Sequence, residues 1–277
     1  RVNTVIAVYS VTRPGAMEGV KYFLVPNVKN FSWMTVVAAM GQMFYSLSIA
    51  MGILITFGSY MKKETSLEDS TRNVEVFDTA IAIMAGLMII PAVFAFSGGD
   101  PDTLQAGPAL MFITIPKVFE NMGFGTVVGI LFFLLVLFAA VTSSIALTES
   151  AVSTFEDELG WSRRRATVLV GVIMIALGSL SSLGYGPLVG IKIIGMQFLD
   201  FFDFLTNSVM MPIAAMLTSL FVSRIVGMKR MEDEIMHGES TFRRKKIFIV
   251  MIKYLCPVFA LIILISSVAN AFGWIAM

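Results

Sequence analysis

Two serines, Ser46 and Ser48, lie at the centre of a long uncharged apolar run in the stretch "GQMFYSLSIAMG". In hydrocarbon every backbone polar group needs a partner, so a helix is interrupted only where protein or a wet cavity receives the freed groups. Serine competes with helical hydrogen bonding, and Ala50 and Gly52 allow close approach of two backbones. Two interpretations remain open. Either the helix is broken near 46–48 and its freed groups bind an ion or substrate, or it is intact and both serines donate to carbonyls one turn earlier.

A second hydroxyl cluster, Thr142 to Ser144, lies in another apolar run, "FAAVTSSIAL". With the Ala139 carbonyl, the Thr142 and Ser143 hydroxyls would form a site of hard oxygen ligands without formal charge, which suits an alkali cation held reversibly. The alternative is helix packing, in which the flanking alanines allow two helices to approach and the hydroxyls bond across the interface.

Acidic residues near the apolar runs are the remaining candidates. Asp78 in "EVFDTAIAIMAG" lies just inside a span, where a carboxylate is costly and is a functional candidate by default. Its alternative is an interfacial residue that reaches the headgroups. Glu149 lies near the cytoplasmic half of its span, while Asp200 and Asp203 share one helix face at spacing i, i+3. A water-exposed surface explains these three equally well.

Composition identifies the kind of protein that carries these clusters. The chain has 277 residues, of which 57% are hydrophobic and 14% charged, with a mean hydropathy of +0.83. These values indicate a polytopic membrane protein. A net charge of +1 offers no basic face for nucleic acid. The single cysteine, Cys256, excludes an internal disulfide, and the single histidine, His237, lies in a charged loop, so an intramembrane enzyme is not expected.

Hydropathy and Gly/Pro punctuation predict the elements that position the candidates. The expected segments are a truncated helix end at 2–12, spans at about 31–60, 74–96, 125–155, 166–183, 203–222 and 248–271, and a loop at about 97–124 that folds back in short helices. Because the chain starts at Arg1 within a run too short to span, we expect it to be a fragment. Basic residues concentrate in the loops at 61–73, 156–165 and 223–247, which are therefore predicted to be cytoplasmic.

Four stretches together resemble the neurotransmitter:sodium symporter family, in its prokaryotic branch with eleven spans. "GQMFYSLSIAMG…ITFGSY" resembles the discontinuous sixth helix of that family, and "FAAVTSSIAL…FEDELGWSRRRA" resembles its eighth helix and following turn. "LDFFDFLTNSVMMP" is similar to the tenth helix, and "AGPALMFITIPKVF" to the fourth extracellular loop. The resemblance implies an all-α polytopic membrane protein with a partial LeuT-like fold. It implies a single transmembrane domain over 1–277, from the end of helix 5 through helix 11, with helix 6 at about 31–60 and discontinuous near 46–48.

The resemblance also implies site residues. The first sodium site would use Ser46 and Asp78, and the second would use Ala139, Thr142 and Ser143. The residues implied to line the substrate pocket are Tyr45, Ser46, Leu47, Ser48, Met51, Ser143 and Leu147. Tyr45 would also cover the substrate, Asp203 and Asp157 would be the acids of the outer and inner gates, and Gln42 would lie near the outer gate. Each gate acid would pair with an arginine outside this chain.

The implied function is sodium-coupled symport of an amino acid across the inner (plasma) membrane by alternating access, with Na⁺ as the co-transported ion and no organic cofactor. Met51, where a phenylalanine is common, and a pocket wall without acidic residues favour a hydrophobic or aromatic substrate. Asp78 brings a fixed negative charge and Ala82 cannot help to hold an anion, which predicts chloride independence. The alternatives are a proton-coupled carrier using Asp78 or Glu149, and a non-transporting sensor or structural subunit in the lipid bilayer.

Overall fold

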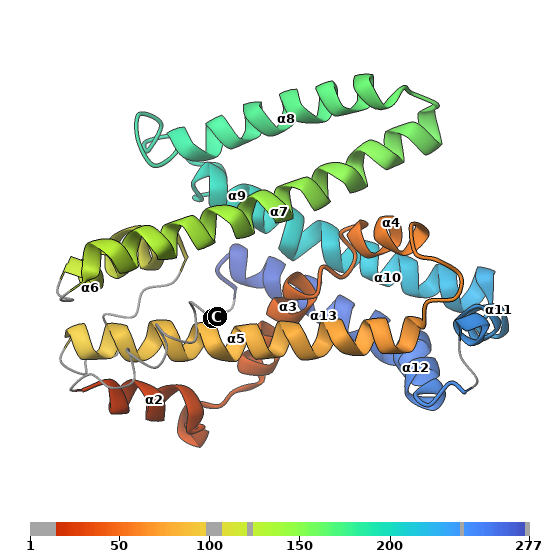
Figure 1. Ribbon diagram of the computed structural model, residues 1–277, viewed down its shortest axis with the longest axis horizontal. Coiled ribbons are helices and arrows are strands. Elements are labelled where there is room, and N and C mark those ends of the chain that lie inside the picture. The colour runs from red at the N-terminus through yellow and green to blue at the C-terminus, as the bar shows by residue number, and fades with distance from the viewer. Residues whose placement is uncertain (1–14, 98–106, 121–123, 239–240, 275–277) are drawn as a thin grey trace. The chain divides into compact units, whose positions relative to one another are not determined.

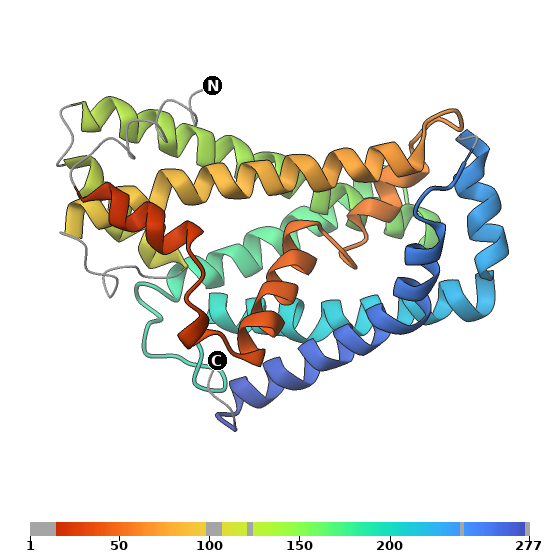
Figure 2. The same ribbon diagram turned by 90° about the horizontal axis from the view of Figure 1, so that it is seen from below.

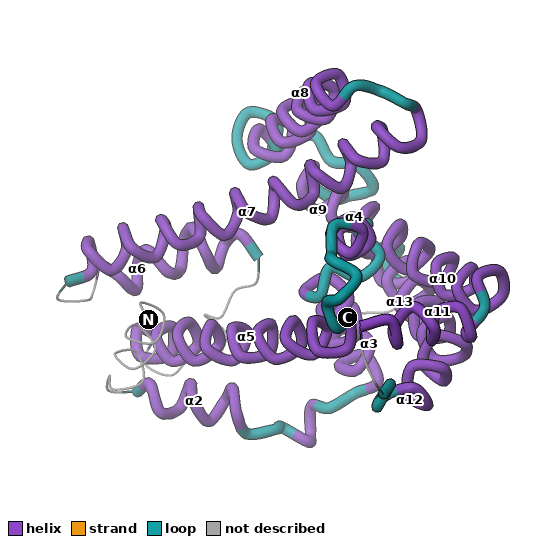
Figure 3. Tube along the Cα trace, turned by 45° about the vertical axis from the view of Figure 1, so that its right-hand side comes forward, coloured by secondary structure: helices purple, strands orange, loops and turns teal. Residues whose placement is uncertain are grey.

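The computed structural model describes residues 15–97, 107–120, 124–238 and 241–274, so the expected helix end at 2–12 and part of the loop at 97–124 lie outside the described residues. The described ranges are helical with turns and contain no strand apart from a single bridge between Ile193 and Met196 (Figures 1 and 3). The chain divides into two compact units. Unit 1 comprises Arg1–Phe31 and Asn73–Ser143, and unit 2 comprises Ser32–Arg72 and Ser144–Met277.

Unit 1 contains a short helix, parts of two long helices and the described part of the folded-back loop. Its elements are α2 (Ala16–Leu24), a 3₁₀ turn (Val28–Asn30), most of α5 (Leu67–Ser97), a π-helical turn (Leu110–Thr114), α6 (Ile115–Glu120) and the first part of α7 (Gly125–Leu159). The borders between the units fall inside α5 and α7.

Helix α2 packs closely on the end of α5. A Cβ at Gly19 would lie 2.8 Å from the Pro91 Cα and 3.0 Å from the Phe94 Cβ, so glycine is required for this approach. The rings of Tyr22 and Phe94 meet at 5.2 Å between centroids. Pro91 is tolerated in α5 at a position where its fully buried ring packs against a neighbour rather than lipid.

Aromatic packing fixes the folded-back loop within unit 1. Met88 of α5, Ile115 of α6 and Phe132 of α7 form a buried cluster. The Phe119 ring meets that of Phe132 edge-on at 5.4 Å, and Phe112 stacks on Phe133 at 6.2 Å. Offset and edge-on ring pairs add to the stabilisation that burial provides.

Unit 2 contains the remaining helices. These are α3 (Trp33–Ser46), α4 (Ile53–Ser59), the end of α7, α8 (Arg163–Leu183), α9 (Phe198–Asp203), α10 (Met211–Phe221), α11 (Met228–Ile235), α12 (Lys245–Val250) and α13 (Cys256–Ala271). The π-helical turns Phe204–Met210, Val222–Val226 and Met251–Leu255 join α9 to α10, extend α10 and join α12 to α13.

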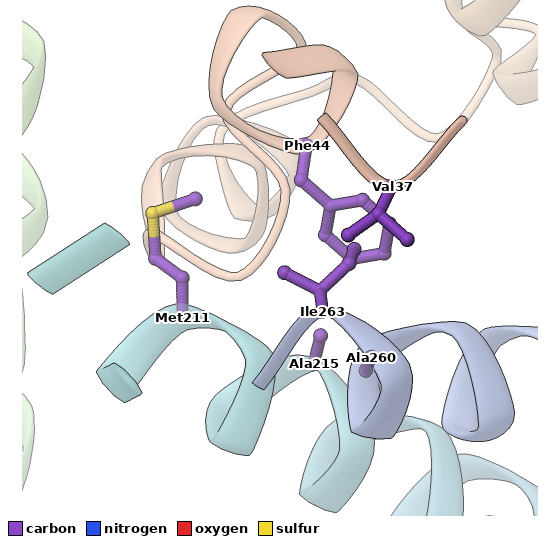
Figure 4. Packing of buried hydrophobic residues seen from close by; sticks show 6 residues of the cluster. All are labelled: Val37, Phe44, Met211, Ala215, Ala260 and Ile263. Atoms are coloured by element: carbon purple, nitrogen blue, oxygen red, sulfur yellow. The ribbon is translucent and has the colours of Figure 1, made fainter. Parts of the chain in front are cut away.

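The core of unit 2 is an apolar cluster between α3, α10 and α13. Val37 and Phe44 of α3 point towards Ile263 of α13, with Ala215 of α10 and Ala260 of α13 close to it and Met211 of α10 to one side (Figure 4). The small side chains Ala215 and Ala260 let α10 and α13 lie side by side (Figure 2). The Ser219 hydroxyl of α10 donates to the Ile252 carbonyl at 2.6 Å. This bond gives a partner to a backbone carbonyl of the π-helical turn Met251–Leu255.

Five helices of the described part of the chain are long and apolar enough to cross a membrane: Leu67–Ala95, Gly125–Leu159, Arg163–Leu183, Phe198–Val226 and Lys245–Ala271. Residues 31–60 form two shorter helices, α3 and α4, instead of one span. The segment 223–247, predicted as a hydrophilic loop, contains helix α11. There Met228, Met231 and Ile235, at spacing i, i+3, i+7, share one face, and Ile235 is buried.

Candidate functional site

Helix α3 ends at Ser46 in a recognisable C-terminal motif. The Ile49 N–H donates to the Phe44 carbonyl at 2.9 Å, and the Ser48 N–H donates to the Tyr45 carbonyl at 3.0 Å. Ser48 between them has φ 53°, in the left-handed region. These features define a Schellman motif, with a serine where glycine is usual and with Ile49 packed beside the Phe44 cluster. The helix is therefore interrupted, and the serines do not lie within one continuous helix.

The turn from Leu47 to Gly52 is conformationally strained. Ser48, Ala50 and Gly52 all have positive φ, at 53°, 64° and 80°. A left-handed conformation costs a non-glycine residue about 1–2 kcal/mol, so Ser48 and Ala50 need tertiary support. Strained backbone of this kind is often found at functional sites, where the surrounding structure holds it.

The predicted substrate-pocket residues fall on both sides of this turn. Tyr45 and Ser46, in the last turn of α3, are exposed, with half of Tyr45 accessible. Met51, by contrast, packs against the apolar cluster of α3, α10 and α13. Leu147, on α7 in the same unit, is 48% exposed. The predicted pocket residues of the turn thus lie in one segment of unit 2, whereas Ser143 belongs to unit 1. A substrate pocket formed by both stays a prediction.

The second hydroxyl cluster lies on α7, with Thr142 and Ser143 in unit 1 and Ser144 at the start of the unit 2 part of the helix. The Thr142 hydroxyl donates to the Ala139 carbonyl at 2.9 Å and to the Phe138 carbonyl at 3.1 Å. Thr142 and Ser143 are both exposed. Two of the three predicted ligand oxygens are therefore adjacent, in an arrangement that is also ordinary for a threonine within a helix.

The predicted first sodium site joins residues of different units. Ser46 belongs to unit 2, and Asp78, half-buried on α5, belongs to unit 1. Their common role stays a prediction.

The predicted outer-gate acid Asp203 has a partner that the sequence analysis did not identify. The Asn207 side-chain amide donates to the Asp203 Oδ1 at 2.5 Å. Asn207 lies in the π-helical turn Phe204–Met210, one turn beyond Asp203. The i, i+4 spacing is the only sequence signal for this pair. Asp157 and Gln42, the other predicted gate residues, are exposed.

Tyr185, in the turn that follows α8, lies close enough to Asp200 to be affected by its charge. Burial raises the pKa of the Tyr185 phenol, and the Asp200 carboxylate raises it further. The phenol is therefore protonated at neutral pH. Asp203 accepts a hydrogen bond from Asn207, while the charge of Asp200 acts on the Tyr185 phenol.

Glu149 links α4, α7 and α8. Its carboxylate accepts a hydrogen bond from the Tyr60 hydroxyl at 2.8 Å and is ion-paired with Arg163 at 2.5 Å. Arg163 also contacts Glu156 at 3.2 Å. Glu149 is therefore not simply a solvated surface residue. Its carboxylate connects three elements that are separated in the sequence.

Comparison with known proteins gives a consistent family assignment. A model described as the Sodium:neurotransmitter symporter family matches residues 2–273. The chain is 33% identical over 231 residues to an uncharacterized sodium-dependent transporter of Bacillus subtilis, covering 83% of this chain and 50% of that protein. It is 32% identical over 263 residues to an uncharacterized sodium-dependent transporter of Haemophilus influenzae, covering 95% of this chain and 56% of the relative. The chain thus spans about half the length of these relatives.

A solved structure matches the fold of the chain. The crystal structure of MhsT in complex with L-phenylalanine superposes with a TM-score of 0.83 at 35% sequence identity. The match covers 96% of this chain and 59% of that chain. The expected all-α fold of LeuT type is thereby confirmed.

Proposed function

The chain belongs to the Sodium:neurotransmitter symporter family, and from this premise we propose that the full protein is a sodium-coupled amino-acid symporter working by alternating access. The chain is part of a multi-pass membrane protein, and we place it in the plasma membrane. The relatives and the structural neighbour are transporters, and covalent chemistry is not part of this function.

The observation that carries the proposal is the strained turn between α3 and α4. A helix interrupted in the middle of a membrane protein needs a cavity or a ligand to receive its backbone groups. In secondary transporters such breaks bind the substrate and the coupled ions. Ser46 and Ser48 supply hydroxyl oxygens beside this turn, and the left-handed residues aim successive backbone groups in different directions. We assign the turn to ion and substrate binding.

Two sodium ions are proposed as co-transported cargo. Asp78 and Ser46 are assigned to the first, and Ala139, Thr142 and Ser143 to the second. The 2.9 Å separation of the Thr142 hydroxyl and Ala139 carbonyl oxygens supports the second assignment, because both oxygens can face one ion. Tyr45 with Asp203 is assigned to closing the outer side, with Gln42 nearby, and Asp157 to closing the inner side. The Asn207 amide supports the outer assignment, because it orients the Asp203 carboxylate.

We propose a hydrophobic or aromatic amino acid as the substrate. MhsT, which is 35% identical to the chain, was solved with L-phenylalanine. The residues assigned to the pocket wall are Tyr45, Ser46, Leu47, Ser48, Met51, Ser143 and Leu147, none of which is charged. An apolar wall binds an apolar side chain, while the polar turn and sodium orient the carboxylate.

Proton coupling is the second candidate. It would require a carboxylate that gains and loses a proton during the cycle. Glu149 is poorly suited to that role, because it is held by both Tyr60 and Arg163. A non-transporting subunit is the third candidate.

Replacing sodium by choline at fixed pH is expected to abolish uptake by the full-length protein in proteoliposomes. The reason is that closely spaced carboxylate, hydroxyl and carbonyl oxygens bind sodium but not the bulky choline cation. Uptake of labelled phenylalanine is measured with and without an imposed pH gradient. Uptake that persists in choline and follows the pH gradient would favour proton coupling. Absence of both uptake and counterflow, in vesicles with verified insertion, would favour the non-transporting alternative.

Replacing chloride by gluconate is expected to leave the initial rate of sodium-driven uptake unchanged. The fixed negative charge of Asp78 is proposed to balance the sodium ion, and Ala82 one turn later offers no hydroxyl for an anion. The measurement compares rates in sodium chloride and sodium gluconate at equal ionic strength. A collapse of uptake in gluconate would contradict this balance of charge.

A further inference from the structure

Helix α4 and helix α7 approach each other closely at Gly52, the last residue of the strained turn. A Cβ built on Gly52 would lie 2.6 Å from the Ser150 Oγ and 3.9 Å from the Ser150 Cβ. The first distance is a clash, and the second is an ordinary contact. Gly52 also has φ 80°, so both the backbone conformation and the neighbouring helix select glycine here.

One turn further along α4, Thr56 continues this contact. Its hydroxyl donates to the Ser150 hydroxyl at 3.4 Å and lies 3.4 Å from the Ser153 hydroxyl. Thr56 and Ser150 are more than nine-tenths buried. The Ser153 hydroxyl donates in turn to the Ser150 carbonyl at 3.1 Å. The Thr56 hydroxyl of α4 therefore lies between two hydroxyls of α7, which act as its polar neighbours in a buried contact. We call Gly52, Thr56, Ser150 and Ser153 the hydroxyl contact.

The two ends of the strained turn are thus held in different ways. On the α3 side, Phe44 and Val37 pack into the apolar cluster with α10 and α13. On the α4 side, the Tyr60–Glu149 bond holds the far end of α4. Beside the turn the contact is made by a glycine and by hydroxyls whose 3.4 Å separations exceed the usual length of 2.7–2.8 Å for such bonds. The α3 anchor depends on burial, which is non-directional, whereas the α4 anchor depends on the placement of a few polar atoms.

We propose that the hydroxyl contact positions α4 and thereby sets the geometry of the turn Leu47–Gly52. This inference rests on the proposed function, because it concerns the turn assigned there to sodium and substrate. Gly52 is both the end of the turn and part of the contact, so a shift of α4 on α7 moves the turn directly. Thr56, Ser150 and Ser153 are positioning residues that act through the turn.

The test uses the full-length protein and measures sodium-dependent binding of labelled phenylalanine in detergent. Thr56→Val keeps the shape of the side chain and removes its hydroxyl, and Ser150→Ala removes the hydroxyl on the other helix. Each is expected to raise the sodium concentration for half-maximal binding about three- to tenfold, the range for polar contacts between membrane helices. Thr56→Ser, which retains a hydroxyl, is expected to stay close to the wild type. Thr148→Val is the matched control, because its hydroxyl contacts the Ser144 carbonyl and Met174 instead of α4.

A second pair of variants tests the close approach of Gly52 to Ser150. Gly52→Ala is expected to reduce binding severely, since the new Cβ meets the Ser150 Oγ at 2.6 Å. Adding Ser150→Ala to Gly52→Ala removes that atom and is expected to restore binding in part, leaving the cost of φ 80°. Because relief of the clash can restore folding as well as position, the amount of folded protein is measured for each variant and binding is expressed per folded molecule.

The outcomes distinguish this inference from the proposed function. Wild-type protein without sodium-dependent binding would overturn the proposed function and the inference together. Wild-type binding with an unchanged sodium requirement in Thr56→Val and Ser150→Ala would overturn the inference alone. The same holds if Ser150→Ala fails to improve Gly52→Ala. Recovery in the double variant, together with a wild-type response of Thr148→Val, is the result that the hydroxyl contact predicts.

Discussion

Replacing Asp78 by alanine in the full-length protein is expected to abolish sodium-dependent substrate binding. Asp78 lies on α5, inside the first of the five candidate membrane-crossing helices. A carboxylate in such a position is costly and is retained where it has a partner or a function. In the proposed first sodium site, the negative charge of Asp78 offsets the free-energy cost of removing water from the sodium ion. Removing one member of a buried charge pair typically costs about 3–5 kcal/mol, which corresponds to a loss of affinity of more than a hundredfold.

The experiment titrates sodium against binding of labelled phenylalanine for wild type and Asp78→Ala. Asp69→Ala is the matched control, because Asp69 is an exposed carboxylate in the first turn of the same helix. The control is expected to bind like the wild type, since an exposed charge contributes little. Binding by Asp78→Ala at the sodium concentrations that serve the wild type would exclude Asp78 as a ligand and charge partner.

Replacing Ser48 by valine is expected to impair transport far more than replacing it by glycine, provided that the backbone of the turn is what matters. Ser48 has φ 53° at the end of the Schellman motif. Glycine adopts this conformation without penalty, whereas a β-branched residue is strongly disfavoured there. The cost of such strain is about 1–3 kcal/mol, enough to unravel the turn or shift its position.

Initial uptake rates of Ser48→Gly and Ser48→Val, normalised to surface abundance, separate the two roles of this residue. If the left-handed conformation dominates, Ser48→Gly retains most activity and Ser48→Val loses most of it. Equal and severe losses would show instead that the hydroxyl, which both variants lack, is the important group. Equal activity of both variants with the wild type would contradict the assignment of the turn to the binding site.

The sequence predicted the helices of this protein better than it predicted the contacts between them. The helices α5 and α8 contain the spans predicted at 74–96 and 166–183. Hydropathy alone indicates them, because in lipid the backbone hydrogen bonds must be made within long apolar helices. The interruption beside Ser46 was one of two open interpretations. It needed the structure because the deciding features, the left-handed φ angles and the Phe44–Ile49 bond, are properties of a folded turn.

The sequence by itself determined a polytopic, all-helical membrane protein, its family and the residues on which binding is proposed to depend. Only the tertiary structure decided which distant side chains meet. Thr56 and Ser150 are 94 residues apart, and no local sequence pattern joins them. The same is true of Glu149 with Tyr60, and of Gly52, whose small size matters only because Ser150 lies against it. Periodicity reports which face of a helix is apolar, but not which helix packs there, and that depends on the free energy of the whole packed fold.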